Sequence, residues 1–244
     1  MQMLVAIALI WFAAVVPARA SSLVIWAWER PEDLRFAPAS AEIAVQTGFI
    51  VLAGDRIEAR GRRFPLRASQ GRLTTSVVHL QLDHRHPVVA SPDHARRVAA
   101  AVLRMGSRAR TQRLQVDFEV RASERPLLLA VLREVRAGLQ PGVVLSMTAL
   151  ASWCGDETWL DAAPVDEIVP MLFRMGPAGS ALKSRLAAGG DFSNPRCRTA
   201  LAVSTDAPII RAPVGRRVYL FSPRSWTPTD FDRVRRRVEA WSDD

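Results

Sequence analysis

Eight short apolar or alternating segments are spread along residues 21–244, with helix-like segments between most of them. They lie at 23–28, 44–52, 76–83, 114–120, 143–150, 168–174, 199–205 and 217–222. Runs of this length and pattern are typical of β-strands. Strands that alternate with helices indicate a parallel sheet, and eight such strands can close into a barrel. The sequence therefore predicts the α/β fold of a (β/α)8 TIM-type barrel, as a single domain over residues 21–244.

The predicted helices begin at residues that favour helix starts. Pro92 after Ser91 and Pro228 after Thr227 place proline at the first helical position. We expect further helices opening at Ser123, near 157–163 and at 179–188. Residues 53–75 instead resemble a hairpin or loop, so the barrel is expected to be irregular or incomplete in its first third.

Polar residues alternate with apolar ones in the fourth predicted strand. Side chains alternate across a strand, so Gln115, Asp117 and Glu119 share one face, opposite the apolar face of Leu114 and Val116. The polar face would point into the barrel, where Val, Ile and Leu are usual. We therefore predict a polar channel that rises to the carboxyl-terminal rim, with a hydrogen-bonded polar core as the alternative.

The third predicted strand repeats this pattern, with His79, Gln81 and Asp83 on one face. Asp83 is therefore a candidate substrate-binding residue, and so is Gln115.

Two carboxyl groups two residues apart suggest acid–base chemistry. In a partly dry cleft both cannot ionise cheaply, so the pKa of one should rise. Cleavage of a glycosidic bond needs such a protonated acid. Glu119, the longer residue and the nearer to the rim, is the predicted general acid, and Asp117 would orient it or stabilise developing positive charge.

Other candidate substrate-binding residues lie at the ends of predicted strands: Trp28, Glu29, Trp153, Arg174 and Asp206. Tryptophan rings suit the apolar faces of sugars, although core packing explains any single tryptophan equally well. Glu29 and Arg174 could also simply form a salt bridge with each other.

Several function classes lack their sequence signals. There is no P-loop, dinucleotide fingerprint or G-x-S-x-G elbow, and the two cysteines and four histidines lack zinc-ligand spacing. The formal net charge of +9 comes from scattered arginines, with Lys183 the only lysine, rather than from one basic stripe. We expect no cofactor, no metal and no nucleic-acid partner, and the oligomeric state stays open.

Residues 1–20 are predicted to be a signal peptide. Residues 3–16 are almost wholly apolar but short for a membrane span, and Ala18-Arg19-Ala20 offers a cleavage site. No Lys or Arg precedes the apolar run, so a misplaced start codon or an uncleaved anchor are alternatives. Cleavage would place the chain in the periplasm or outside the cell, with no later transmembrane segment.

Cys154 and Cys197 are a tentative disulfide, as an even pair in an oxidising compartment suggests. Cys154 follows the fifth strand, near the carboxyl-terminal rim, whereas Cys197 precedes the seventh strand, near the opposite end. A disulfide needs Cα atoms within about 7 Å. Either residues 189–197 climb the barrel wall or both cysteines stay unpaired.

Several longer stretches resemble a family of exported bacterial proteins known only as a domain of unknown function. They are WAWERPEDLR (26–35), LQVDFE (114–119), TALASWC (148–154), PMLFRMG (170–176) and VSTD (203–206). The resemblance covers nearly the whole chain after residue 20 and implies a glycosidase-like barrel, without an established activity. More distantly, Asp117 and Glu119 are similar to the end of the chitinase-type D-x-x-D-x-D-x-E strand. In this chain Gln115 stands where that pattern has its middle aspartate.

Two functions follow as hypotheses. The first is a hydrolase acting on a glycan of the cell envelope, with Glu119 and Asp117 at its centre. The second is a non-catalytic envelope protein that binds glycan or a partner on a degenerate barrel, because one barrel fold serves many functions. Two carboxyl groups facing one open cleft would favour hydrolysis, and a single acid tied to arginine would favour binding.

Overall fold

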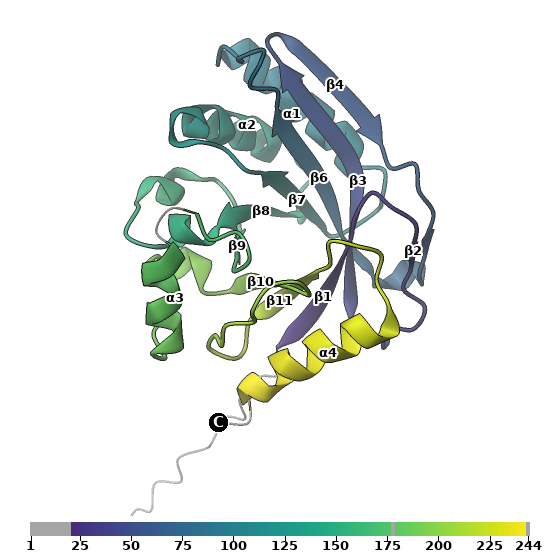
Figure 1. The fold of residues 1–244 in the computed structure, drawn as a ribbon. Coiled ribbons are helices and arrows are strands. Elements are labelled where there is room, and N and C mark those ends of the chain that lie inside the picture. Colours follow the sequence, from purple (N-terminus) through teal and green to yellow (C-terminus); the bar gives the residue numbers. More distant parts are fainter. Residues whose placement is uncertain (1–20, 177–178, 243–244) are drawn as a thin grey trace, which may run out of the picture.

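The fold is a closed barrel of eight parallel strands (Figure 1). The computed structural model describes residues 21–176 and 179–242, so the predicted signal peptide lies outside the described residues. The barrel strands are β1 (Ser22–Ala27), β3 (Glu42–Ala53), β6 (Leu73–Leu82), β7 (Arg113–Phe118), β8 (Val144–Leu150), β9 (Glu167–Met171), β10 (Ala200–Ser204) and β11 (Arg217–Phe221). Pairing of β1 with both β11 and β3 closes the ring. The predicted (β/α)8 class is confirmed.

Four α-helices pack outside the strands: α1 (Pro92–Gly106), α2 (Arg125–Gly138), α3 (Gly179–Ala187) and α4 (Pro228–Glu239). The Ser91 hydroxyl accepts from the His94 N–H and the Thr227 hydroxyl from the Asp230 N–H, so both predicted caps are present. The helix expected from Ser123 begins at Arg125, after a 3-10 turn at Ala122–Glu124. The helix expected near 157–163 is only a 3-10 turn, Trp159–Ala162.

The first third is irregular, as expected, but the barrel is complete. A hairpin strand, β4 (Arg56–Gly61), runs antiparallel to β3 where a crossover helix would normally lie. Two short strands, β2 (Glu32–Asp33) and β5 (Leu66–Arg67), pair with each other. Figure 1 shows the β3–β4 hairpin standing at the edge of the barrel. The alternative of an incomplete barrel is wrong, because β1 and β3 pair directly.

One glycine fixes how closely α1 approaches this hairpin. A Cβ atom added at Gly48 would lie 2.5 Å from the Cβ atom of Met105 in α1. Only glycine therefore allows the helix to pack here. The same part of β3 has a register irregularity against β6, between Gln46 and Gly48, which later determines which side chains face the interior.

The core has an outer and an inner layer, and the two faces of β7 point toward different layers. Its apolar side chains, among them Leu114, Val116 and Phe118, join the outer layer beneath the helices. The smaller inner layer includes Trp26, Met171 and Tyr219. The alternation of β7 thus directs its polar residues into the barrel.

A disulfide joins Cys154 to Cys197, with 5.9 Å between their Cα atoms. The segment around Cys197 lies along the connection from β8 to β9, because the Asn194 N–H donates to the Cys154 carbonyl and Arg196 donates to three carbonyls of that connection. Of the two arrangements considered, the structure has the one in which the loop climbs the barrel wall. The expectation that the cysteines lie at opposite ends is wrong.

Across the residues with described positions, no helix is long and apolar enough to cross a membrane.

Candidate functional site

The part of the barrel interior near the amino ends of the strands holds a network of hydrogen bonds and ion pairs centred on Glu167. Its Oε2 atom accepts from Ser146 at 2.7 Å and from Tyr219 at 2.8 Å. Arg113 lies 3.2 Å from the same oxygen, and Arg217 lies 3.6 Å from Oε1. We call these five residues the floor cluster. Its carboxylate is compensated by two cations and two hydroxyl donors, which is what burial of a charge requires.

Gln115 connects this floor to the middle of the barrel. Its Oε1 atom accepts from the Trp26 indole N–H at 2.8 Å, and its amide donates to Ser146 at 3.0 Å. Gln115 is fully buried. It faces inward as predicted but lies beneath the open site, where its polar atoms are occupied by protein partners.

Above this layer a cavity of about 800 Å³ opens at the carboxyl ends of the strands. Barrel enzymes keep their active sites at this end. Six predicted site residues line it: Trp28, Glu29, Asp117, Glu119, Arg174 and Asp206. Residues that we had not named as site residues complete the wall, among them Gln46, Phe49, Arg60, His79, Phe173 and Phe221.

His79 and Asp117 form a charged pair in the cavity wall. The His79 Nδ1 atom lies 2.5 Å from Asp117 Oδ2, and the Thr148 hydroxyl donates to Oδ1 at 2.6 Å. Burial opposes the charge on both groups, but their mutual attraction outweighs it, so the pKa of Asp117 is lowered and that of His79 is raised. The pairing therefore favours the carboxylate form of Asp117 and the imidazolium form of His79.

Glu119 is held much more loosely. Its Oε1 atom lies 3.6 Å from the Arg174 Nε atom, beyond hydrogen-bond distance, and the two side chains are 41% and 62% exposed. Burial and the neighbouring Asp117 carboxylate raise the pKa of Glu119, while Arg174 and His79 oppose the rise. Glu119 is therefore the member of the carboxylate pair whose pKa is raised, as expected for one of the two. We call His79, Asp117, Thr148, Glu119 and Arg174 the rim cluster.

Aromatic rings surround the rim cluster. Phe49 stacks on His79 with 5.1 Å between ring centroids, and Trp28 meets the same imidazole edge-on at 5.9 Å. Phe173 and Phe221 stack at 5.0 Å on the other side of the barrel. These rings give the cavity flat apolar surfaces beside its charges.

Three buried polar atoms of cavity-wall residues have no hydrogen-bond partner among the described residues: the Trp28 indole Nε1, the Glu29 Oε2 and the Arg30 Nε, which lies 3.1 Å from the Glu32 carboxylate. Glu29 uses its other oxygen to accept from the Arg63 backbone N–H at 2.9 Å. The salt bridge considered between Glu29 and Arg174 is not formed, because Arg174 pairs with Glu119.

Two predicted residues lie away from the cavity. Trp153 is buried in the outer core layer, 5.0 Å from the ring of Trp159, because a 3-10 turn carries it off the strand axis. Asp83 lies just beyond the end of β6 and accepts from the Arg85 N–H and from His86 in its own turn. Neither is placed to contact a ligand bound by the rim cluster.

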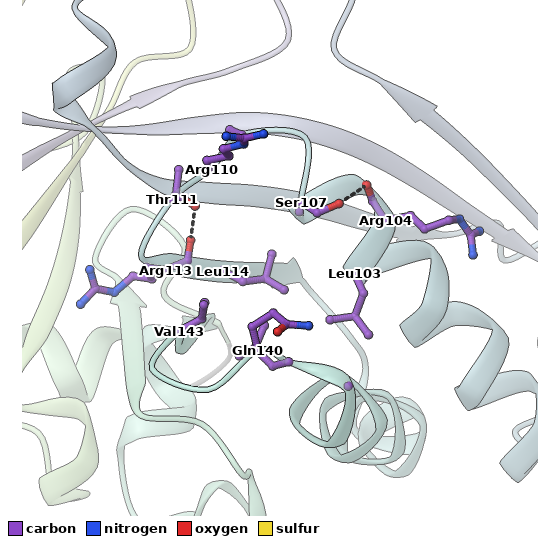
Figure 2. Close-up of a pocket in the computed structure, with 13 residues that line it drawn as sticks. Leu103, Arg104, Ser107, Arg110, Thr111, Arg113, Leu114, Gln140 and Val143 are labelled. Atoms are coloured by element: carbon purple, nitrogen blue, oxygen red, sulfur yellow. Dashed lines mark hydrogen bonds between the residues drawn. The ribbon is translucent and has the colours of Figure 1, made fainter.

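A second hollow, of about 450 Å³, lies at the opposite end of the barrel, between the carboxyl ends of α1 and α2 (Figure 2). Its apolar wall includes Leu103, Leu114, Leu139 and Val143. Figure 2 shows the Arg104 and Arg113 side chains directed away from it. Its lining contains no carboxylate or histidine, so it offers no acid–base chemistry.

Within residues 21–176 and 179–242, no three His, Cys, Asp or Glu side chains lie close enough together to bind a metal ion.

The fold places the chain in the structural class of (β/α)8 barrels, with an open cavity at the carboxyl ends of the strands. The chain is similar to the crystal structure of an apo endo-β-N-acetylglucosaminidase from Cordyceps militaris, with a TM-score of 0.52 over 92% of each chain. The two sequences are 10% identical, so the likeness concerns the fold alone. No family model matches the chain, and neither does a curated protein.

Proposed function

We propose that this protein is a hydrolase acting on a cell-envelope glycan, with Glu119 as its general acid. The observation that carries the proposal is the position of Glu119, half-exposed in an open cavity beside the buried carboxylate of Asp117. A carboxyl group whose pKa is raised stays protonated closer to neutral pH, which general-acid catalysis requires.

The geometry supports distinct roles for the two acids. Glu119 would donate its proton to the glycosidic oxygen as the bond to the leaving sugar breaks, and water would then add to the anomeric carbon and release a proton that restores the acid. Asp117, kept ionised by His79 and Thr148, would stabilise the positive charge that develops on the sugar ring. His79 is a positioning residue, because it acts through Asp117.

The substrate assignment rests on three supports. The aromatic rings of Trp28, Phe173 and Phe221 suit the apolar faces of sugars. The cavity wall also contains polar side chains, among them those of Glu29 and Gln46, of the kind that bond sugar hydroxyls. The similar barrel is named as an endo-β-N-acetylglucosaminidase, an enzyme that acts on a glycan. The signal-like residues 1–20 favour an envelope location.

The test is turnover by the purified protein without residues 1–20, on cell-envelope glycan preparations and on N-acetylglucosamine oligomers. Glu119→Gln should reduce turnover at least about 100-fold, as loss of a general acid does. Glu58→Gln, at an exposed glutamate on β4 outside the cavity, is the matched control and should leave turnover unchanged. Undiminished turnover in Glu119→Gln would contradict the proposal.

One contact favours the second candidate, a glycan-binding protein without catalysis. Glu119 has an arginine partner in Arg174, which stabilises its ionised form. Binding of an envelope glycan without release of reducing ends by the wild-type protein would establish this alternative.

A further inference from the structure

The arginines of the cavity differ in how they are compensated. Arg30 forms an ion pair with Glu32 and donates to the carbonyls of Ser222 and Pro223. Arg60 forms no ion pair with a described residue, and its guanidinium lies 4.6 Å from the centre of the Phe49 ring. Among the described residues Arg174 forms one ion pair, the 3.6 Å contact with Glu119, and it also lowers the pKa of the more distant, His79-paired Asp117. Two cations in this cavity are therefore weakly compensated.

The four acidic residues of the cavity leave Arg60 and Arg174 weakly compensated, because most of them have other partners. Asp117 is paired with His79, and Glu29 accepts from the Arg63 N–H. Asp206 accepts from Ser204. Glu119 is the only carboxylate that pairs with Arg174, and none of the four forms an ion pair with Arg60.

The proposed reaction makes this imbalance larger. A general acid must carry its proton when the substrate is bound, and protonated Glu119 is neutral. Arg174 would then face the cavity without an anionic partner in the protein. The Arg174 side chain is 62% exposed, so it would offer an anionic group of the ligand an accessible cation with no competing carboxylate.

Resting on that proposed function, we infer that the substrate is an acidic glycan, whose carboxylate or other anionic substituent binds Arg174 in place of Glu119. The substituent would draw the guanidinium away from Glu119, which leaves the acid beside Asp117 and His79 and favours its protonated form. Binding of the correct substrate would thus prepare the general acid.

Arg60 would add to the preference for an acidic glycan from the other side of the cavity mouth. It lies on the β3–β4 hairpin, and in the ring of eight strands β3 is opposite β9, the strand that precedes Arg174. A glycan lying across the mouth would therefore meet a cation on either side. Arg60 is remote from the proton transfer, so its contribution is to affinity alone.

The test measures binding to Glu119→Gln, in which turnover is blocked and Arg174 lacks its carboxylate. The probes are a hyaluronan hexasaccharide and an N-acetylglucosamine–N-acetylmuramic acid tetrasaccharide, each compared by calorimetry with its carboxyl-reduced form. At least one acidic probe should bind about tenfold more tightly than its neutral form, with the difference shrinking at high salt. Equal or weaker binding of both acidic probes, or no binding of any probe, overturns the inference.

Substitutions in the same background assign the effect to residues. Arg174→Met should remove most of the preference for the acidic probe, and Arg60→Met should remove part of it. Arg104→Met is the matched control, because Arg104 is an exposed arginine on α1, at the other end of the barrel. A preference that survives both cavity substitutions also overturns the inference.

Turnover by the wild-type protein separates this inference from the proposed function. Tight binding of an acidic probe without its hydrolysis would reject the hydrolase and keep the anion site. Hydrolysis of neutral and acidic probes at equal efficiency would keep the hydrolase and reject the anion site. If both hold, Arg174→Met should lower kcat for the acidic substrate, whereas Arg60→Met should raise only KM.

Discussion

The floor cluster and the rim cluster are both polar networks inside one barrel, but they are built differently. At the floor, one buried carboxylate receives two hydroxyl donors and two arginines. At the rim, Asp117 is similarly enclosed, whereas Glu119 has a single loose partner and faces an open cavity. A saturated network stabilises the fold, and an unsaturated network retains groups that a ligand can use.

The two ends also differ in the hollows beside them. The lining of the hollow at the amino-terminal end includes leucine, valine and arginine but no aromatic ring and no acid, and its threonine and serine hydroxyls donate to nearby backbone carbonyls (Figure 2). The cavity at the carboxyl-terminal end combines rings with charges. The comparison therefore predicts stability effects from floor substitutions and activity effects from Glu119.

The largest stability effect should come from the floor. Glu167→Gln removes the carboxylate that pairs with Arg113, whereas Arg217 keeps Glu42 at 2.7 Å, and it should lower the free energy of unfolding by about 3 kcal/mol, as the loss of one partner of a buried ion pair does. Urea unfolding measures it, with Glu58→Gln as the exposed control. A loss as small as that of the control would mean that the floor is not the stabilising network described.

A smaller loss is expected from the enclosed half of the rim. Thr148→Val preserves shape but removes a donor to the buried Asp117 carboxylate, which should cost about 2 kcal/mol. It should also raise the pKa of Asp117, which this hydrogen bond helps to lower. The exposed Thr199→Val is the control for unfolding, and equal stability of the two variants would contradict the assigned bond.

The charged pair of the rim should appear in the pH dependence of stability. The raised pKa of His79 contributes stability that is complete below about pH 6.5 and is lost as the pH rises through the folded-state value. The lowered pKa of Asp117 contributes stability above about pH 3.8, which is lost as the pH falls through its folded-state value.

The stability advantage of the wild type over His79→Gln should therefore be largest between these limits and shrink at alkaline pH. Chemical denaturation across the pH range measures it, with the exposed His84→Gln as the control. An advantage that grows above pH 8 would be inconsistent with an imidazolium at position 79.

The smallest stability effect is expected at Glu119, the residue with the largest proposed effect on turnover. Glu119→Gln should change the free energy of unfolding by less than about 0.5 kcal/mol, because its ion pair is loose and solvent-accessible. A loss approaching that of Glu167→Gln would show that Glu119 belongs to a structural network, which would remove the contrast between rim and floor.

Much of this arrangement could be predicted from the sequence because strands impose a period of two. The alternation in β7 placed Asp117 on the inner face, beside His79 from β6. Glu119 lies one residue beyond the end of β7 and continues this alternation into the same cavity.

The predictions that failed concern residues just beyond strand ends. Trp153 follows β8 directly in the sequence, but the 3-10 turn there directs its ring into the outer core. Asp83 likewise belongs to a turn that uses up its oxygens. Beyond a strand end the local turn decides the direction of the side chain: Glu119 still faces the cavity, whereas the turns at Trp153 and Asp83 direct these residues away from it.

Three of the cavity residues that were missed come from the β3–β4 hairpin: Gln46, Phe49 and Arg60. Gln46 and Phe49 both line the cavity although they are three residues apart, an odd spacing that a regular strand forbids. The irregularity between Gln46 and Gly48 changes the alternation at that point. Arg60 enters the site only because β4 pairs with β3, which puts it opposite Phe49, and nothing in the sequence fixes that register.

The strand β4 takes part in the site without taking part in the closure of the barrel, since the ring is completed by β1 and β3 alone. Exposed positions on it can therefore change in size or charge while every hydrogen bond that closes the barrel is preserved. Ligand preference could be re-engineered in this one hairpin, independently of the machinery on β6 and β7, and a barrel with the same acids would then accept different ligands.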